Sequence, residues 1–180
     1  ISNKIMILAR TSDRDPKNPT NGLSLFFTDF NKQSIEARII DKMGRSAVDT
    51  NELFIDNLEV PKEDLIGEEG KGFSYILHSL NPERILLAAE AYGIAKNALD
   101  RAAKYANERI VFERPIGQNQ SIQHPLADGW AKLEATKLMF LKAASQYDNN
   151  LPCGLEANAA KYLAAEFGME VCKQAIATHG

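Results

Sequence analysis

The chain has 180 residues, with 21 lysines and arginines against 24 aspartates and glutamates, so its net charge at pH 7 is −3. This balance gives no electrostatic reason to expect a nucleic-acid partner. No apolar run approaches the roughly 20 residues that a membrane-spanning helix needs. Hydrophobic residues make up 44% of the chain, which indicates a folded globular protein and not a disordered one.

The first sixty residues predict short strands separated by turns. The expected strands are Lys4–Arg10, Leu23–Asp29, Ile35–Ile40 and Glu52–Val60. Residues 13–22 are dense in turn-forming residues and predict a loop between the first two strands. Several short strands in succession predict an antiparallel sheet or a small barrel.

The pattern changes from strand to helix near Pro61. Residues 61–71 are polar and rich in glycine, and we interpret them as a solvated hinge. A short helix is expected over Gly72–Leu80, followed by a long helix that begins at Pro82, where proline suits the first helical position. Phe112–Gly117 then breaks the long helix, and two further helices are expected over 121–147 and 155–178.

This order of elements predicts an α+β fold, with a short antiparallel β segment followed by an up-and-down helical bundle. We expect a β domain over residues 1–60, a connector over 61–71 and a helical domain over 72–180. The chain begins without methionine and stops where a helix would end, so we interpret it as an interior piece of a longer protein.

Two groups of residues have candidate chemistry. Glu83 and Arg84 follow Asn81 and Pro82, and the plain interpretation is a helix start with a first-turn carboxylate. Arg109 precedes a turn and a run of amides, where a guanidinium could bind a phosphate or could simply lie at a helix end. No metal site is expected, because two cysteines and three widely spaced histidines match no ligand spacing.

The order of these motifs resembles the acyl-CoA dehydrogenase family. The segments that carry the resemblance are Glu52–Pro61, Gly67–Phe73, Glu83–Ile85, Arg109–Phe112, Pro115–Gln120, Leu126–Asp128 and Ala175–Gly180. The resemblance covers essentially the whole chain. It implies the second half of a middle β-domain and most of a C-terminal helical domain.

The resemblance implies a flavoprotein of fatty acid metabolism that binds FAD and assembles as a homotetramer or homodimer. A carboxylate would remove the α-proton of an acyl-CoA, a hydride would pass from the β-carbon to flavin N5, and trans-2-enoyl-CoA would form. The electrons would go to an acceptor such as an electron-transfer flavoprotein. The protein would be cytoplasmic in a bacterium or lie in the mitochondrial matrix of a eukaryote, and the 180 residues alone would be inactive.

The resemblance also implies roles for single residues. Glu83 matches one of two positions of the family's catalytic base, the other being a glutamate beyond residue 180. The implied substrate-binding residues are Asn81 and Arg84, and the implied cofactor-binding residues are Arg109, Phe112 and Gln120. Glu113 stands where the family usually has glycine.

Two alternatives remain open from the sequence. One is an acyl-CoA oxidase or a related flavoenzyme of the same fold. The other is a non-catalytic helical module that serves assembly. The sequence does not predict the length or branching of the acyl chain.

Overall fold

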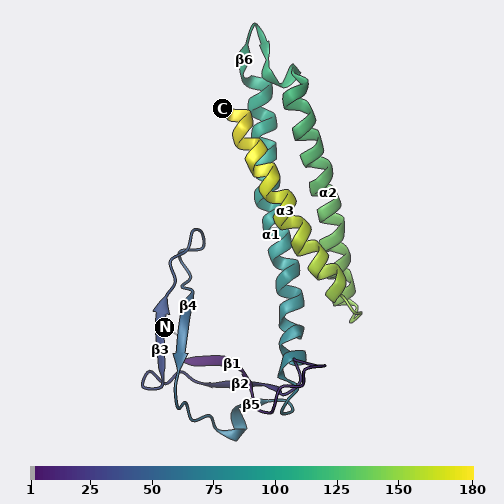
Figure 1. The fold of residues 1–180 in the computed structure, drawn as a ribbon. Coiled ribbons are helices and arrows are strands. Elements are labelled where there is room, and N and C mark those ends of the chain that lie inside the picture. The colour runs from purple at the N-terminus through teal and green to yellow at the C-terminus, as the bar shows by residue number, and fades with distance from the viewer. Residues whose placement is uncertain (1–2) are drawn as a thin grey trace. The chain divides into compact units, whose positions relative to one another are not determined.

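The computed structural model describes residues 3–180 and shows short antiparallel strands followed by three long helices (Figure 1). The predicted α+β class is therefore confirmed. The chain divides into two compact units, one ending at Leu77 and the other spanning His78–Gly180, and the division falls inside the first long helix. The domain limits expected from the sequence stay a prediction.

The first sheet joins two strands of the predicted β domain with a short strand inside the predicted connector. Strands β1 (Lys4–Arg10) and β2 (Leu23–Asp29) have the predicted bounds and pair antiparallel. On its other edge β2 pairs with β5 (Leu65–Ile66), a short strand that the sequence did not suggest. Leu25, near the middle of β2, is buried between these neighbours.

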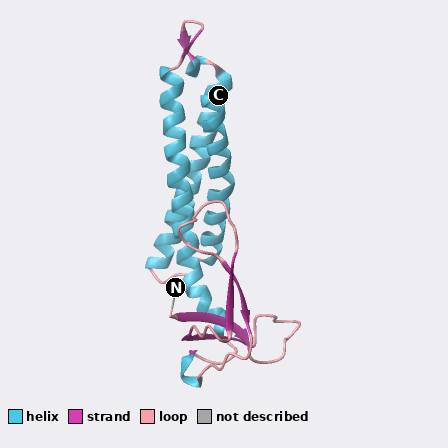
Figure 2. Cartoon of the chain, turned by 90° about the vertical axis from the view of Figure 1, so that its left-hand side faces the viewer, coloured by secondary structure: helices cyan, strands magenta, loops and turns pink. Residues whose placement is uncertain are grey.

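A second sheet is a separate hairpin of β3 (Ile35–Ile39) and β4 (Asn51–Ile55), shown in Figure 2 among the magenta strands. The expectation of one sheet or a small barrel is wrong, because β3 and β4 pair only with each other. The expected strand Glu52–Val60 is also too long. Asn57 adopts a φ of 49°, in the left-handed region, so the extended backbone ends there.

The connector is bonded to the first sheet near its end, and its interpretation as a solvated hinge stays a prediction. The fully buried hydroxyl of Ser24 accepts a hydrogen bond from Gly70 N at 2.7 Å, and Gly22 N donates to Gly70 O at 3.2 Å. Gly67, with a φ of 68°, lies against the ring of Tyr75. Only glycine combines this backbone conformation with so close an approach.

Helix α1 is continuous over Gly72–Glu108, with Pro82 inside it, so the predicted break at Asn81-Pro82 is wrong. Proline lacks the N–H that would bond to the carbonyl four residues earlier, and this loss usually ends a helix. Here the turns before Pro82 are anchored through Gly72 and Tyr75, and the turns after it enter the helical core. Tertiary contacts on both sides therefore hold the helix together across the proline.

The helical unit packs α1 with α2 (Gln120–Asp148) and α3 (Gly154–His179), within two residues of the predicted bounds of the last two helices. Small side chains line the closest contacts. Ala88 of α1 packs with Ala160 and Ala164 of α3, and all three are essentially inaccessible. Alanine allows helix axes to approach closely, which explains the tight core.

A short hairpin separates α1 from α2. Its strands β6 (Ile110–Val111) and β7 (Arg114–Pro115) are joined by Phe112 and Glu113, which have φ values of 51° and 63°. A two-residue loop with two positive φ values matches the right-handed twist of the strands but favours glycine or asparagine. Phe112 and Glu113 therefore occupy an unfavourable backbone conformation.

We expect Gly72→Ala to destabilise the protein by about 1–3 kcal/mol, since a Cβ at residue 72 would lie 2.4 Å from Leu25 N. The matched control is Gly93→Ala in the same helix, where an added Cβ meets nothing within 4 Å. There alanine should stabilise by about 1 kcal/mol. Urea unfolding of both variants measures the two free energies, and equal midpoints would contradict the close approach at Gly72.

We expect Glu113→Gly to stabilise the protein by about 0.5–1 kcal/mol, because glycine adopts a positive φ without steric cost. Glu113→Ala is the control, since it removes the same carboxylate but keeps a Cβ. Thermal unfolding should show a higher midpoint for the glycine variant alone. A gain of the same size in the alanine variant would mean that the charge, and not the backbone, is the source of strain.

Candidate functional site

The first group of predicted site residues lies at the hairpin end of α1. The backbone of Arg109 is fixed, because its N–H donates to Tyr105 O at 2.8 Å and its carbonyl accepts from Ile116 N at 2.9 Å. The guanidinium of Arg109 is exposed and has no hydrogen-bond or ion-pair partner among residues 3–180. The hairpin thus presents a positioned cation whose five donors are available.

The other predicted cofactor residues lie beside Arg109. The Phe112 side chain is 94% exposed, and Gln120 is the exposed first residue of α2. In contrast, Arg114 is used within the hairpin region, where its Nη2 donates to Asn119 Oδ1 at 2.8 Å. The structure therefore brings Arg109, Phe112 and Gln120 to the same end of the helical unit.

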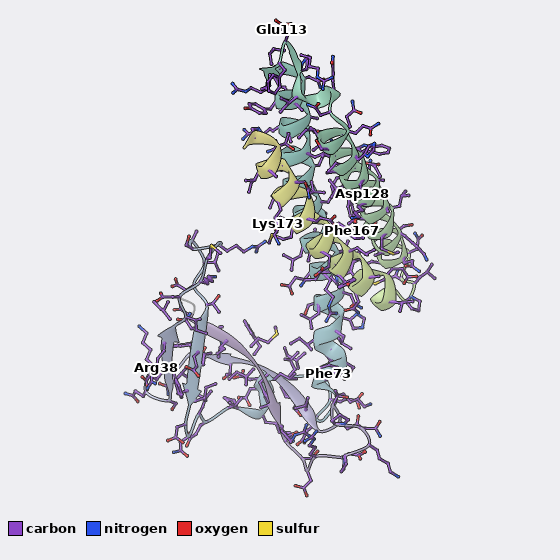
Figure 3. All side chains as sticks on the ribbon, turned by 45° about the horizontal axis from the view of Figure 1, so that its top comes forward. Arg38, Phe73, Glu113, Asp128, Phe167 and Lys173 are labelled. Atoms are coloured by element: carbon purple, nitrogen blue, oxygen red, sulfur yellow. The ribbon has the colours of Figure 1, made fainter. Side chains whose placement is uncertain are left out.

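These residues fit the pyrophosphate of a dinucleotide cofactor. An unpaired guanidinium can donate two parallel hydrogen bonds to phosphate oxygens, and an exposed aromatic ring offers a flat apolar surface. Figure 3 shows Glu113 at the tip of the hairpin. Its carboxylate adds negative charge close to the place where a pyrophosphate would bind, which weakens the local attraction.

The second group of predicted residues lies far along α1. Arg84 Nη1 donates to Asn81 Oδ1 at 3.0 Å, so these two side chains share one side of the helix. Glu83 follows Asn81 by two residues, which is about 200° around an α-helix. Its carboxylate is exposed and has no partner in the described part of the chain. Asn81 and Arg84 are thus brought together, and Glu83 projects from the opposite side.

Glu83 is the twelfth residue of α1 and does not lie at a helix start. The interpretation of Glu83 as a first-turn cap is therefore wrong. The field of a helix dipole falls off within the first turn, so it does not act on this carboxylate.

A cavity of about 370 Å³ lies beside Asn81, and the sequence gave no indication of it. Its lining comes from α1, from the last turn of α2 and from the connection between α2 and α3: His78, Asn81, Tyr147, Asn150, Leu151, Pro152 and Cys153. His78 lies one turn before Asn81 in the sequence of the helix. Helical spacing could therefore have predicted that His78 lines the same cavity. Nothing in the sequence pairs the residues after 146 with α1, because they are about seventy positions away.

The two groups of site residues are well separated within one chain. At 1.5 Å per residue, α1 carries about 38 Å of helix between Glu83 and Glu108. Figure 1 shows the β6 hairpin at one end of α1, beyond the last turn of the helix. The candidate base and the candidate pyrophosphate ligand of a single chain therefore do not meet.

Within residues 3–180, no group of three His, Cys, Asp or Glu side chains is arranged to hold a metal ion. No helix in the same described part has a stretch that is long and apolar enough to cross a membrane.

Comparison with known proteins gives consistent matches. The probable acyl-CoA dehydrogenase YdiO of Escherichia coli K12 is 38% identical over 176 residues, covering 98% of this chain and 45% of YdiO. The 3-(aryl)acrylate reductase of Clostridium sporogenes is 38% identical over 181 residues, covering 100% of this chain and 47% of that protein. The solved FAD complex of PigA matches with a TM-score of 0.90 and 26% identity, covering 100% of this chain and 46% of PigA.

The chain spans a little under half the length of the curated relatives that it matches. Residues 70–180 match the family described as "Acyl-CoA dehydrogenase, C-terminal domain". The match begins in the connector and includes all three helices. The resemblance stated from the order of the motifs is thus confirmed, and the chain belongs to the acyl-CoA dehydrogenase family.

Proposed function

We propose that the complete protein is an FAD-dependent acyl-CoA dehydrogenase that converts an acyl-CoA thioester to trans-2-enoyl-CoA. The observation that carries the proposal is Arg109, which has a fixed backbone and an unpartnered guanidinium in the described chain. Membership of the family and the FAD complex of a structural neighbour support the cofactor. The proposed electron acceptor is an electron-transfer flavoprotein.

We assign Arg109 to the flavin site of a neighbouring subunit. Roughly 38 Å of helix separates it from Glu83, so the two residues of one chain serve different sites. In a homo-oligomer, each hairpin would complete the site of another copy, with Phe112 and Gln120 next to the same cofactor. This arrangement agrees with the homotetramer or homodimer that the family resemblance implies.

We assign proton removal to Glu83. A carboxylate takes a proton from carbon efficiently when water is excluded and the developing enolate is stabilised by hydrogen bonds. The oxygens of Glu83 are free to accept a proton, since they have no partner in the described chain. FAD, when bound, supplies the acceptor for the hydride. Asn81 and Arg84 hold each other in one orientation. We propose that they bind a part of the substrate other than the carbon that Glu83 deprotonates, because Glu83 lies about 100° or more around the helix from both.

A second candidate is the same chemistry in the opposite direction. The Clostridium sporogenes relative, 38% identical along the whole chain, is named a 3-(aryl)acrylate reductase. A reductase would add a hydride and a proton across the double bond that a dehydrogenase forms. Anaerobic titration of the complete protein with saturated and 2-unsaturated thioesters separates the two directions. Fast reoxidation of the flavin by air, with peroxide formed, would instead indicate an oxidase.

We expect Glu83→Gln in the complete protein to reduce flavin bleaching by acyl-CoA by several orders of magnitude, with FAD still bound, because glutamine cannot accept the α-proton. Stopped-flow absorbance under anaerobic conditions measures the rate. The matched control is Glu90→Gln, which removes an exposed carboxylate two turns further along the same side of α1. Bleaching of the Glu83 variant at the parental rate would move the base to another residue.

We expect Arg109→Ala to lower the flavin content of the purified complete protein while leaving its thermal unfolding nearly unchanged, since the side chain has no partner to lose. Arg109→Lys should restore part of the content, because a lysine keeps the charge but loses the bidentate geometry. Arg101→Ala, another exposed arginine of α1, is the control. Equal flavin-to-protein ratios in all four proteins would refute the assignment.

A further inference from the structure

The loop between β1 and β2 ends in Asn21-Gly22, the one place in the 180 residues where glycine directly follows asparagine. Asparagine is a chemically labile residue, because the backbone nitrogen of the next residue can attack its side-chain amide carbon. The attack is easiest before glycine, which has no Cβ to obstruct the approach. The sequence therefore contains one site where spontaneous deamidation is intrinsically fast.

The structure leaves the side chain that is attacked unrestrained. Asn21 is exposed, and its side-chain amide has no hydrogen-bond partner among residues 3–180. Because no bond holds the side chain, it is free to rotate about its own bonds. Protection within the described chain must therefore come from the backbone around Gly22.

The attacking nitrogen is held in a hydrogen bond. Gly22 N donates to Gly70 O at 3.2 Å, and Gly22 O accepts from Thr11 N at 2.9 Å. Attack requires Gly22 N to lose its proton and to turn toward the Asn21 side chain. The bond to Gly70 keeps the proton in place and directs the nitrogen to the connector, so it opposes both changes.

The peptide group between the two residues is fixed as well. Arg10 Nη1 donates to Asn21 O at 2.9 Å, and Arg10 Nη2 donates to Pro19 O at 2.7 Å. On the other side of the residue, Asn21 N donates to Asn18 O at 3.0 Å. The peptide plane cannot turn without breaking these bonds.

Gly70, the acceptor for Gly22, is itself held by the first sheet. Gly70 N donates to the hydroxyl of Ser24 at 2.7 Å, and this hydroxyl also shares a hydrogen bond of 2.7 Å with that of Thr11. Ser24 is fully buried, so water does not compete for these bonds. The protection of Asn21 thus depends on the attachment of the connector to β2.

We propose that Asn21 is a deamidation site that the hydrogen bond between Gly22 and Gly70 keeps inactive, and that it reacts when the connector detaches locally from the sheet. In the reaction, Gly22 N bonds to the side-chain carbonyl carbon of Asn21. The bond from that carbon to the amide nitrogen breaks, and ammonia leaves with the proton of Gly22 N. Water then opens the succinimide at either carbonyl, which gives aspartate or isoaspartate. The inference goes beyond the proposed flavin chemistry and does not depend on it.

The isoaspartate product would weaken the same attachment. Its main chain runs through the side chain of residue 21 and is one carbon longer before Gly22. Gly22 could then not keep its bonds to Gly70 and Thr11 in their present positions. One local opening of the connector would therefore leave a lasting chemical mark that favours further opening.

Peptide mapping by mass spectrometry tests the inference on the complete protein, incubated at mildly alkaline pH. Residue 21 should stay asparagine in the folded protein and should convert quickly in guanidinium chloride, where the bond between Gly22 and Gly70 is absent. Ser24→Ala deprives Gly70 N of its acceptor, and this loss should raise the rate in the folded protein about fivefold or more. The matched control is Thr28→Ala, which removes another buried hydroxyl from β2 and should keep the parental rate.

Three outcomes would overturn the inference. Equal rates in the folded and the unfolded parent protein would mean that the fold gives no protection, and this comparison needs no variant. A parental rate in Ser24→Ala, shown by circular dichroism to be folded, would separate the protection from the connector. Faster conversion of another asparagine in the unfolded protein would move the reactive site. None of these outcomes affects the flavin proposal, which is judged by cofactor content and bleaching.

Discussion

The approach of Gly72 to the backbone of β2 is the constraint on which the unit that ends at Leu77 depends. An added Cβ would lie 2.4 Å from Leu25 N and 2.5 Å from the Ser24 carbonyl carbon, so the first turn of α1 begins in contact with the sheet backbone. The buried Ser24 hydroxyl, which binds Gly70 N, holds the residues just before this turn. The start of α1 is therefore fixed on the sheet within this unit.

Much of the secondary structure could be predicted, because the spacing of hydrophobic residues and the presence of turn-forming residues can both be recognised within short segments of the sequence. The strands Lys4–Arg10 and Leu23–Asp29 were correct in full, and the ends of α2 and α3 were correct to within two residues. The largest error was at Pro82, where the local signal for a break is strong. The helix continues because of contacts at Gly72 and Tyr75, and a single sequence does not show these long-range contacts.

The sequence predicted which residues belong to the candidate site, but it did not predict how these residues are arranged in space. Helical spacing alone shows that Asn81 and Arg84 share a side and that Glu83 does not, once the helix is known to be continuous. The cavity at Asn81 could not be foreseen, since Tyr147 at the end of α2 and Cys153 in the following loop line it and are distant in sequence. The separation of Glu83 from Arg109 likewise becomes clear only when α1 is seen to be unbroken. In the proposed function, the two motifs of one chain therefore belong to two sites.

The alanine contacts between α1 and α3 limit which amino-acid substitutions the helical unit can accommodate. Ala88, Ala160 and Ala164 are 0–1% exposed and leave no space between the two helices. Any larger residue at these positions would force the axes apart and would shift both ends of the bundle, where the hairpin and the α2–α3 loop lie. Substitutions on the outer faces and in the loops do not meet this limit, so the spacing of the helices can stay constant while these surfaces change.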